Sequence, residues 1–424
     1  MTGTPDNGSG DAAEMLKAGW IILSTTWLIQ AIYGAVKPWI TVSMMECQRA
    51  RFRNGKDARR PRLALIVAAK GLTPEFHRFL ELVTHQNYPA YRLIFATESA
   101  DDPAAIALRK FLGLSNEETV WRPAESKPGI QEIRLSAAGE ATNCGQKVFN
   151  QLAAFRELEP ADEIIAFADA DIVGGGNWLE QLVMPLILDE GDLSTGYRWF
   201  FPRSASLSDA VATNINAAIA IMNGPSFHTL MWGGSMALTR ACFDELRVPE
   251  LLEGCLNDDL TISDAARRAG KRFEFVRPLM AASPVHYTWK GLFEFGRRQY
   301  FQVRVYVPAF WWTALGLTTL WCLSMVWNWA ALLLGHWEAA PVIASVVLLD
   351  WIRSFSRTRY LKHVFSPEQR SQLRGARRWE WWTTWLNMLV HWAVIVSTFP
   401  IREITWAGIR YRVDGPRKVK VLSR

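Results

Sequence analysis

Cysteine is scarce in this sequence. The five cysteines among 424 residues are scattered, and they show neither the paired spacing of a metal site nor the pattern of a disulfide framework. They are Cys47, Cys144, Cys242, Cys255 and Cys322. This usage fits a reducing compartment. Internal repeats are also absent, and biased composition is confined to the first dozen residues.

Charged residues are missing from long stretches of the chain. Residues 18–36 contain none, and further apolar runs cover 305–335, 341–352 and 381–400. A bilayer core requires about 20 consecutive apolar residues, so the first two runs predict membrane spans. The alternative, a helix buried in a soluble core, suits 341–352 but not 18–36 or 305–335. Many of the 21 tryptophans lie at or near the ends of these runs, as amphipathic rings do at membrane interfaces.

The charges around the first apolar run predict its orientation. Lys17 is the only basic residue before the run, which does not fit a secretory signal peptide. Seven basic residues follow it at once: Arg49, Arg51, Arg53, Lys56, Arg59, Arg60 and Arg62. Because basic residues beside a span stay in the cytoplasm, we expect a disordered segment 1–17 outside, a helix 18–44 across the membrane, and the central domain inside.

The carboxyl-terminal third raises a conflict of topology. We expect about three membrane segments within 307–400, with the basic loop 353–378 in the cytoplasm. Four full crossings in the whole chain would then place the basic tail 401–424 outside. We therefore expect 381–400, or one of the runs before it, to be re-entrant or interfacial.

Residues 60–288 have the pattern of a doubly wound α/β domain. Continuous apolar runs predict buried parallel strands, and amphipathic stretches between them predict helices on both faces of the sheet. The expected strands are 63–69, 91–97, 164–168 and 272–276, and the expected helices are 75–87, 103–113, a helix starting at residue 178 and one ending at residue 269.

Acidic residues follow two of the expected strands. Glu98, Asp101 and Asp102 come after the second strand, and Asp169 and Asp171 come directly after the third. Ligands of α/β sheets bind beyond the carboxyl ends of strands. Mg²⁺ or Mn²⁺ held by Asp169 and Asp171, with substrate phosphates completing the coordination, is the expected use of this pair. The alternative for an Asp-x-Asp pattern is an ordinary turn.

A second acidic pair lies later in the domain. Asp258 and Asp259 precede a predicted helix, and a simple helix cap is the alternative explanation. A general base is needed to take the proton of an acceptor, and Asp259 is our candidate, with Asp258 supporting it. Gly233 and Gly234 indicate backbone that passes close to a ligand.

A basic and aromatic stretch, 289–306, predicts a helix at the membrane surface. It contains Arg298, Gln299 and Arg304, which are candidates for binding phosphate, as is Lys147 earlier in the chain. Retention of positive charge on the inner side is the alternative explanation for these arginines. The basic residues lack the aromatic-and-basic platform of a nucleic-acid site, so no nucleic-acid partner is expected.

These residues together resemble family 2-type glycosyltransferases of the GT-A fold, and among them the ceramide glucosyltransferases. The acidic sites of that family are similar to the stretch 101–104, to Asp169-Ala170-Asp171 and to Asp258-Asp259. The segment 147–150 resembles its lysine-containing segment, and 404–412 resembles its tail motif. The Q/R-x-x-R-W motif is not intact, and its pieces resemble a shifted bacterial version that uses Gln299, Arg304 and Tyr306.

The resemblance implies an inverting transfer of a sugar from a UDP-sugar to a lipid hydroxyl, with ceramide as the leading acceptor. It implies Asp259 as the base, a site for Mg²⁺ or Mn²⁺, and binding of the donor by Glu98, Asp101 or Asp102. The expected location is a bacterial inner membrane, with the catalytic domain in the cytoplasm. Transfer to diacylglycerol or a hopanoid, a processive polysaccharide synthase and a non-catalytic membrane scaffold remain alternatives.

Overall fold

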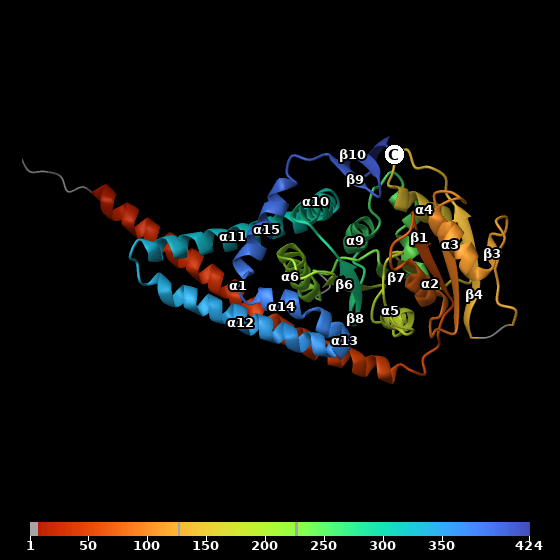
Figure 1. Ribbon diagram of the computed structural model, residues 1–424, viewed down its shortest axis with the longest axis horizontal. Helices are drawn as coiled ribbons and strands as arrows, with labels where there is room; N and C mark the ends of the chain where they lie inside the picture. Colours follow the sequence, from red (N-terminus) through yellow and green to blue (C-terminus); the bar gives the residue numbers. More distant parts are fainter. Residues whose placement is uncertain (1–6, 126–127, 225–227) are drawn as a thin grey trace, which may run out of the picture.

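The computed structural model describes residues 7–125, 128–224 and 228–424, with side chains described from Glu14 onward. Figure 1 shows two parts of different character. Long helices run side by side at one end, and an α/β domain with a mixed sheet lies at the other. Both parts are joined through α1 (Asn7–Asn54) and through α10 (Trp289–Tyr306).

Within the part of the chain that the structure describes, three helices are long and apolar enough to cross a membrane. They are the Glu14–Asn54 part of α1, α11 (Pro308–Leu333) and α12 (Ala339–Val364). α1 packs against both of the others, and the rings of Trp27 and Trp321 meet edge to face with their centroids 5.8 Å apart. The structure therefore has one candidate span near the amino terminus and two in the carboxyl-terminal third, as expected for a membrane protein.

α1 differs from the prediction at both ends. It begins at Asn7 and ends at Asn54, so it extends beyond the expected span of 18–44. Residues 7–17, which we expected to be disordered, are helical. Good helix formers such as Ala12, Ala13, Met15 and Leu16 allow the helix to continue upstream of the apolar run.

The apolar run 381–400 forms only a short helix, α15 (Thr384–Ser397). Its 14 residues span about 21 Å, which is less than the thickness of a bilayer core. α15 packs against α10, α11 and α6 (Leu207–Met222). α15 is therefore too short to be a fourth candidate for a membrane-spanning helix.

The basic tail folds onto the α/β domain. Its strands β9 (Glu403–Trp406), β10 (Ile409–Gly415) and β11 (Lys418–Ser423) form an antiparallel sheet. The Val421 amide donates to the Thr142 carbonyl at 3.1 Å. The tail and the domain therefore lie on the same side of any membrane that the three long helices cross, which removes the conflict of topology.

The domain is built on an eight-stranded sheet in the order β3-β4-β2-β1-β5-β7-β6-β8. β1 pairs in parallel with β2 and β5, β2 with β4, and β6 with β8, while β7 is antiparallel to both neighbours. The strands are β1 (Leu63–Ala68), β2 (Ala90–Thr97), β3 (Val120–Trp121), β4 (Gly129–Ala137), β5 (Ile164–Ala168), β6 (Leu193–Pro202), β7 (Ser235–Thr239) and β8 (Phe273–Val285).

Helices cover both faces of this sheet. Alternate side chains of β1 enter two different cores, with Leu65 in the core that includes α2 and α5 and Ile66 in the core that includes α4 and α7 to α9. The predicted α/β class is therefore confirmed. The remaining helices are α2 (Phe76–Thr84), α3 (Pro103–Leu112), α4 (Gln146–Phe155), α5 (Trp178–Ile187), α7 (Arg240–Glu245), α8 (Val248–Leu252), α9 (Asp259–Arg268), α13 (Pro367–Gln372) and α14 (Arg374–Glu380).

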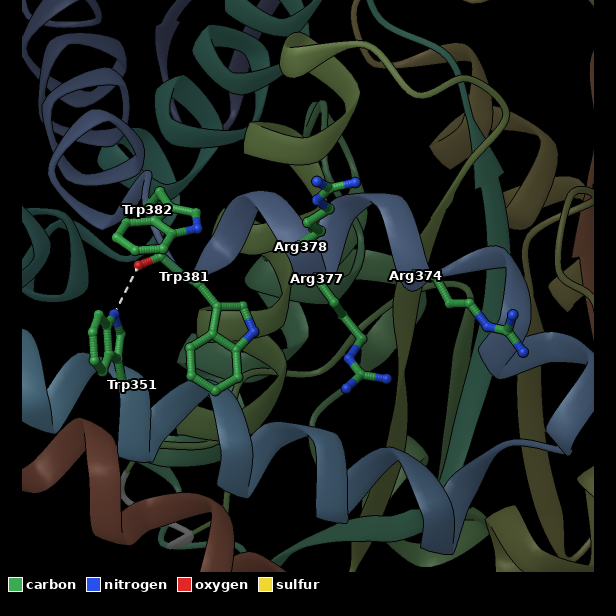
Figure 2. Close-up of a pocket in the computed structure, with 6 residues that line it drawn as sticks. All are labelled: Trp351, Arg374, Arg377, Arg378, Trp381 and Trp382. Carbon is green, nitrogen blue, oxygen red and sulfur yellow. Dashed lines mark hydrogen bonds between the residues drawn. The ribbon is translucent and has the colours of Figure 1, made fainter.

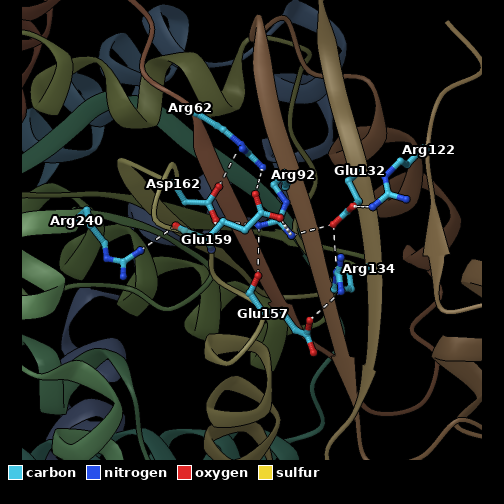
Figure 3. Close-up of polar contacts among 9 residues, drawn as sticks. All are labelled: Arg62, Arg92, Arg122, Glu132, Arg134, Glu157, Glu159, Asp162 and Arg240. Carbon is cyan, nitrogen blue, oxygen red and sulfur yellow. Dashed lines mark hydrogen bonds and ion pairs between the residues drawn. The ribbon is translucent and has the colours of Figure 1, made fainter. Parts of the chain in front are cut away.

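A buried ion-pair network lies at the amino-terminal ends of the central parallel strands (Figure 3). Arg92 on β2 donates to Asp162 at 2.9 Å and to Glu132 on β4 at 2.8 Å, and its side chain is 2% exposed. Glu159 adds a contact at 3.1 Å. The network joins β2, β4 and the residues before β5 at the ends of the strands opposite to the predicted site, so its role is structural.

Candidate active site

A cavity of about 590 Å³ lies at the carboxyl ends of β1 and β5. Asp169 and Asp171, which follow β5, line one part of it, and Asp258 and Asp259 at the start of α9 line another. α10 and the tail complete the wall. The two acidic pairs predicted from the sequence therefore converge on one cavity, although they lie some ninety positions apart in the chain.

Lys147 bridges the two acidic pairs. Its Nζ lies 2.8 Å from Asp169 Oδ1 and 3.1 Å from Asp258 Oδ2. The residue stands in the first turn of α4, two positions after Gly145, where a Cβ would lie 2.5 Å from the Leu256 carbonyl oxygen. Burial opposes the charged form, but the surrounding carboxylates raise the pKa of Lys147. The lysine is therefore a fixed positive charge between the pairs.

Asp258 is a buried carboxylate held by neighbours. Its Oδ2 accepts from Gln151 Nε2 at 2.6 Å and pairs with Lys147. Burial favours the neutral acid, but Lys147 and the hydrogen bond from Gln151 outweigh it and lower the pKa of Asp258. Its side chain does not cap α9, since the Leu260 amide donates to Asn257 Oδ1 instead. The helix-cap alternative is therefore wrong for Asp258.

Asp259 has the opposite electrostatic environment. Burial, together with the negative charge of Asp258, raises the pKa of Asp259 to about 6. Its carboxylate accepts from the Gly233 amide at 2.7 Å and from the Leu260 amide at 2.7 Å, which fixes its orientation. Neighbouring carboxyls whose pKa values are driven apart are a common basis for dividing acid and base roles.

The donor atoms of Asp169 and Asp171 fit a hard divalent cation. Mg²⁺ typically takes one or two protein carboxylates and completes its shell with substrate phosphates and water. Asp171 lies at the mouth of the cavity and is exposed to solvent, although protein atoms crowd around it. Burial and then Asp169 raise the pKa of Asp171. Within the described residues, no group of three or more His, Cys, Asp and Glu side chains could hold a metal by itself.

Two arginines line the same cavity as the acidic groups. Arg298 and Gln299 on α10 line it, and so does Arg198 on β6. The Arg198 guanidinium lies 5.6 Å from the Trp232 ring centroid and 5.5 Å from that of Phe295. Each arginine has a buried Nε that lacks a hydrogen-bond partner among the described residues. Such donors suit an anionic ligand.

Comparison with known proteins identifies the family at this point. A model of glycosyl transferase family 21 matches residues 25–419. The chain belongs to glycosyl transferase family 21. It is therefore a glycosyltransferase, as the sequence predicts. No curated protein matches it.

Two solved structures illustrate how distant the structural relatives of this family 21 chain are. Staphylococcus aureus TarS 1-349 in complex with UDP-GlcNAc is 10% identical, with 85% of this chain and 99% of that chain covered and a TM-score of 0.36. Glucosyl-3-phosphoglycerate synthase from Mycobacterium tuberculosis is 13% identical, with 61% and 81% covered and a TM-score of 0.34.

Three predicted residues of the glycosyltransferase lie beside the cavity lining. Glu98 pairs with Lys70, which does line the cavity, and accepts from Arg424 at 2.8 Å. Asp102 accepts from the Ala104 amide and thereby caps α3, and it also accepts from the Gly71 amide at 3.0 Å. Asp101 is exposed. These acids therefore shape the loops after β1 and β2 at the rim.

Arg304 lies away from the cavity, in contrast to the prediction. Its guanidinium donates to the carbonyls of Phe399 and Ile401 at the start of the tail. The residue lies six positions after Arg298 on α10, so it faces a different side of the helix. Arg304 therefore holds the tail in place.

The two glycines approach protein groups rather than open space. A Cβ on Gly233 would lie 2.7 Å from Lys147 Nζ, and a Cβ on Gly234 would lie 2.3 Å from the Trp232 ring. Neither glycine lines the cavity. The close approach predicted from the sequence is real, but the neighbours are the Lys147 cluster and Trp232.

Some residues that line the cavity are not among the site residues predicted from the sequence. Arg198 stands in β6 within an aromatic run, Tyr197-Arg198-Trp199-Phe200, and a single arginine in such a strand was the available signal. Tyr411 and Trp406 come from the tail, and the Tyr411 hydroxyl accepts from the Gln146 amide at 3.2 Å. The tail therefore forms part of the site and braces the start of α4.

Proposed function

We propose that the chain transfers a sugar from a UDP-sugar to the hydroxyl of a membrane lipid, with ceramide as the leading acceptor and with inversion at the anomeric carbon. The observation that carries the proposal is the pair Asp258 and Asp259. They are adjacent in the chain and share one cavity, yet the pKa of Asp258 is lowered and that of Asp259 is raised to about 6.

Asp259 acts as the general base in this proposal. The acceptor oxygen attacks the anomeric carbon, the bond from that carbon to the UDP oxygen breaks, and the hydroxyl proton passes to Asp259. The base is near its pKa at neutral pH, which favours proton transfer. The backbone donors at Gly233 and Leu260 keep the carboxylate oriented. Asp258, paired with Lys147, stays ionised, and its negative charge raises the pKa of the base.

The diphosphate of the donor suits the cationic side of the cavity. Arg198 and Arg298 offer guanidinium donors, whose fork matches phosphate oxygens. Asp169 and Asp171 would hold Mg²⁺ or Mn²⁺. When bound, such an ion stabilises the negative charge of the departing UDP. The rim formed by Lys70, Glu98 and Asp102 is suited to the uridine.

The acceptor can reach the cavity from the membrane side. α10 lines the cavity with Arg298 and Gln299 and continues through Val307 into the membrane helix α11. We therefore propose that α10 lies at the membrane surface. A lipid hydroxyl would then enter between α10 and the tail, where Trp406 lines the cavity. The basic residues after the first span favour a cytoplasmic domain, and a bacterial inner membrane is part of the same proposal.

The experiment compares Asp259→Asn with Asp264→Asn, a matched change on the same helix where Asp264 pairs with Arg268 at 2.9 Å. Detergent-solubilised protein is mixed with a panel of UDP-sugars and with ceramide, diacylglycerol or a hopanoid. We expect Asp259→Asn to bind UDP but to lose about 10²- to 10⁴-fold in transfer, while Asp264→Asn stays active.

Mass spectrometry of the products separates the alternatives. A single sugar on ceramide supports the proposal, and a single sugar on another lipid corrects the acceptor. Products with many sugars would indicate a processive synthase. UDP binding without any transfer by the wild type would indicate a scaffold. Full turnover by Asp259→Asn would remove this residue from the role of base.

A further inference from the structure

A second cavity, of about 520 Å³, lies at a distance from the proposed active site. Its lining comes from α12, from α14 and from the residues after α14 (Figure 2). The lining residues are Trp351, Arg374, Arg377, Arg378, Trp381 and Trp382. We call this set the Trp–Arg pocket. It shares no residue with the cavity of the acidic pairs.

The Trp–Arg pocket lies where α12 changes from apolar to charged. Residues 339–349 of α12 carry no charge, and the first charged residues are Asp350 and Arg353. Trp351 stands between them. On the neighbouring helix α1, Trp39 lies further along, beside Arg359 of α12, whose guanidinium is 4.8 Å from its ring centroid. A change from apolar to charged residues with a tryptophan between them is typical of a bilayer interface, and here it lies at the end of α12 nearer to the α/β domain.

The aromatic part of the pocket suits that level. Trp351 Nε1 donates to the Trp381 carbonyl at 3.2 Å, and its ring centroid lies 5.8 Å from that of Trp382. Trp382 remains 67% exposed and Trp381 36% exposed. Exposed indole rings have few uses in water, but they are favourable at the headgroup level of a membrane.

The arginines supply positive charge to the pocket, although the Arg377 guanidinium also donates to Thr358 Oγ1 and lies near Glu380. Among the described residues, no salt bridge joins Arg374, Arg377 or Arg378 to a carboxylate. The nearby Glu380 is already paired with Arg357 at 2.6 Å. Figure 2 shows the three arginines along α14 and the three tryptophans gathered at one end of it. The pocket therefore joins three guanidinium groups to an aromatic edge.

We propose that the Trp–Arg pocket binds the phosphate headgroup of an anionic phospholipid. The guanidinium forks match phosphate oxygens, and the tryptophans match the boundary between headgroup and acyl chains. Basic pockets beside membrane helices on the cytoplasmic side are typical sites for such headgroups. The site is separate from the acceptor site, so it goes beyond the proposed transfer reaction. It would hold α14, which packs against α6, at a fixed depth.

Native mass spectrometry of the full-length protein in detergent tests this proposal, with dioleoyl phosphatidylglycerol as the probe and phosphatidylcholine as the neutral lipid. The double variant Arg374→Gln/Arg378→Gln removes two exposed guanidinium groups. The matched control, Arg53→Gln/Lys362→Gln, removes two exposed charges from the same basic side of the molecule but outside the pocket.

We expect the wild type to bind phosphatidylglycerol at least about tenfold more tightly than phosphatidylcholine, a preference that the pocket variant loses and the control keeps. UDP binding should stay at the wild-type level in both variants, which shows that they are folded. Equal losses in both variants would contradict the proposal, because they would indicate a diffuse basic surface. Inorganic phosphate that binds as tightly as the lipid, and only when the pocket is intact, would overturn the assignment to a lipid.

Discussion

Lys147 Nζ lies 3.1 Å from Asp258 Oδ2, so the carboxylate directly before the proposed base forms an ion pair with a fixed ammonium group. This ion pair gives Asp258 and Asp259 different charge environments, which two adjacent aspartates in the sequence do not reveal. Asp258 is kept ionised, and its charge in turn helps to raise the pKa of Asp259. The chemistry of the site depends on this asymmetry.

Lys147→Met should move the acidic limb of the pH profile. The positive charge of Lys147 lowers the pKa of Asp259, although burial raises that pKa more strongly. Without the lysine, the pKa of Asp259 rises, and transfer should fail at a higher pH than in the wild type. Transfer rates measured across pH check this, with the exposed Lys110→Met as the control. An unchanged limb would show that Lys147 does not act on Asp259.

Gly233→Ala should disable the site without unfolding the domain. The new Cβ would lie 2.7 Å from Lys147 Nζ and 3.2 Å from Asp259 Oδ2, so it would displace the base from the backbone amide. We expect a loss of transfer of about 10²-fold or more, because misplacement of about 1 Å can cost that much. Gly175→Ala, where nothing lies within 4 Å, is the control. Equal activity of the two variants would contradict the packing described.

Removal of divalent cations should weaken UDP binding. Chelation followed by titration with UDP should give a weaker dissociation constant, and Mg²⁺ or Mn²⁺ should restore it. The restoration should fail in Asp171→Asn, because that residue would supply one of the carboxylate ligands. Calorimetry measures both effects without any turnover. Equal UDP affinity with and without the cation would place the ion outside the site.

Arg92→Met should destabilise the domain by about 3–5 kcal/mol, because it leaves buried carboxylates unpaired. Arg122→Met is the control, since Arg122 also pairs with Glu132 but is 63% exposed, and we expect less than about 1 kcal/mol there. Thermal unfolding in detergent measures both. Arg92 and its neighbours outweigh burial and lower the pKa of Glu132 to about 2, so stability should fall as pH drops toward that value. Equal effects of the two variants would contradict a buried network.

Much of the fold could be predicted because its signals are local. The apolar runs of β1, β2 and β5 and the uncharged stretches of α1 and α11 are visible without any contact information. β4 and β6 were not predicted, because their polar and aromatic residues, such as Glu132 and Arg198, gain contacts only in the folded sheet. β7 has only five residues and follows two glycines, so its sequence did not indicate a strand. The length of α15 and the docking of the tail likewise depend on tertiary contacts.

Part of the predicted set of site residues shares one cavity for the same reason. Asp169, Asp171, Asp258 and Asp259 follow strand ends or begin a helix, so topology alone brings them together. Which of the two adjacent carboxylates is paired with a cation depends on Lys147, which is more than a hundred positions upstream. Arg304 was assigned to the site because it is near Arg298 in sequence, but the helix turns it toward the tail. Side-chain direction separates such neighbours.

The pH dependence of kcat/KM for sugar transfer tests the central claim most directly, since it reports the pKa of the base in the free enzyme. The pKa of Asp259 is raised to about 6. Below that value its carboxylate carries a proton and no longer accepts one. The rate should therefore fall about tenfold for each pH unit below 6 and level off above it. A rate that stays constant from about pH 7 to about pH 5 would contradict Asp259 as the base.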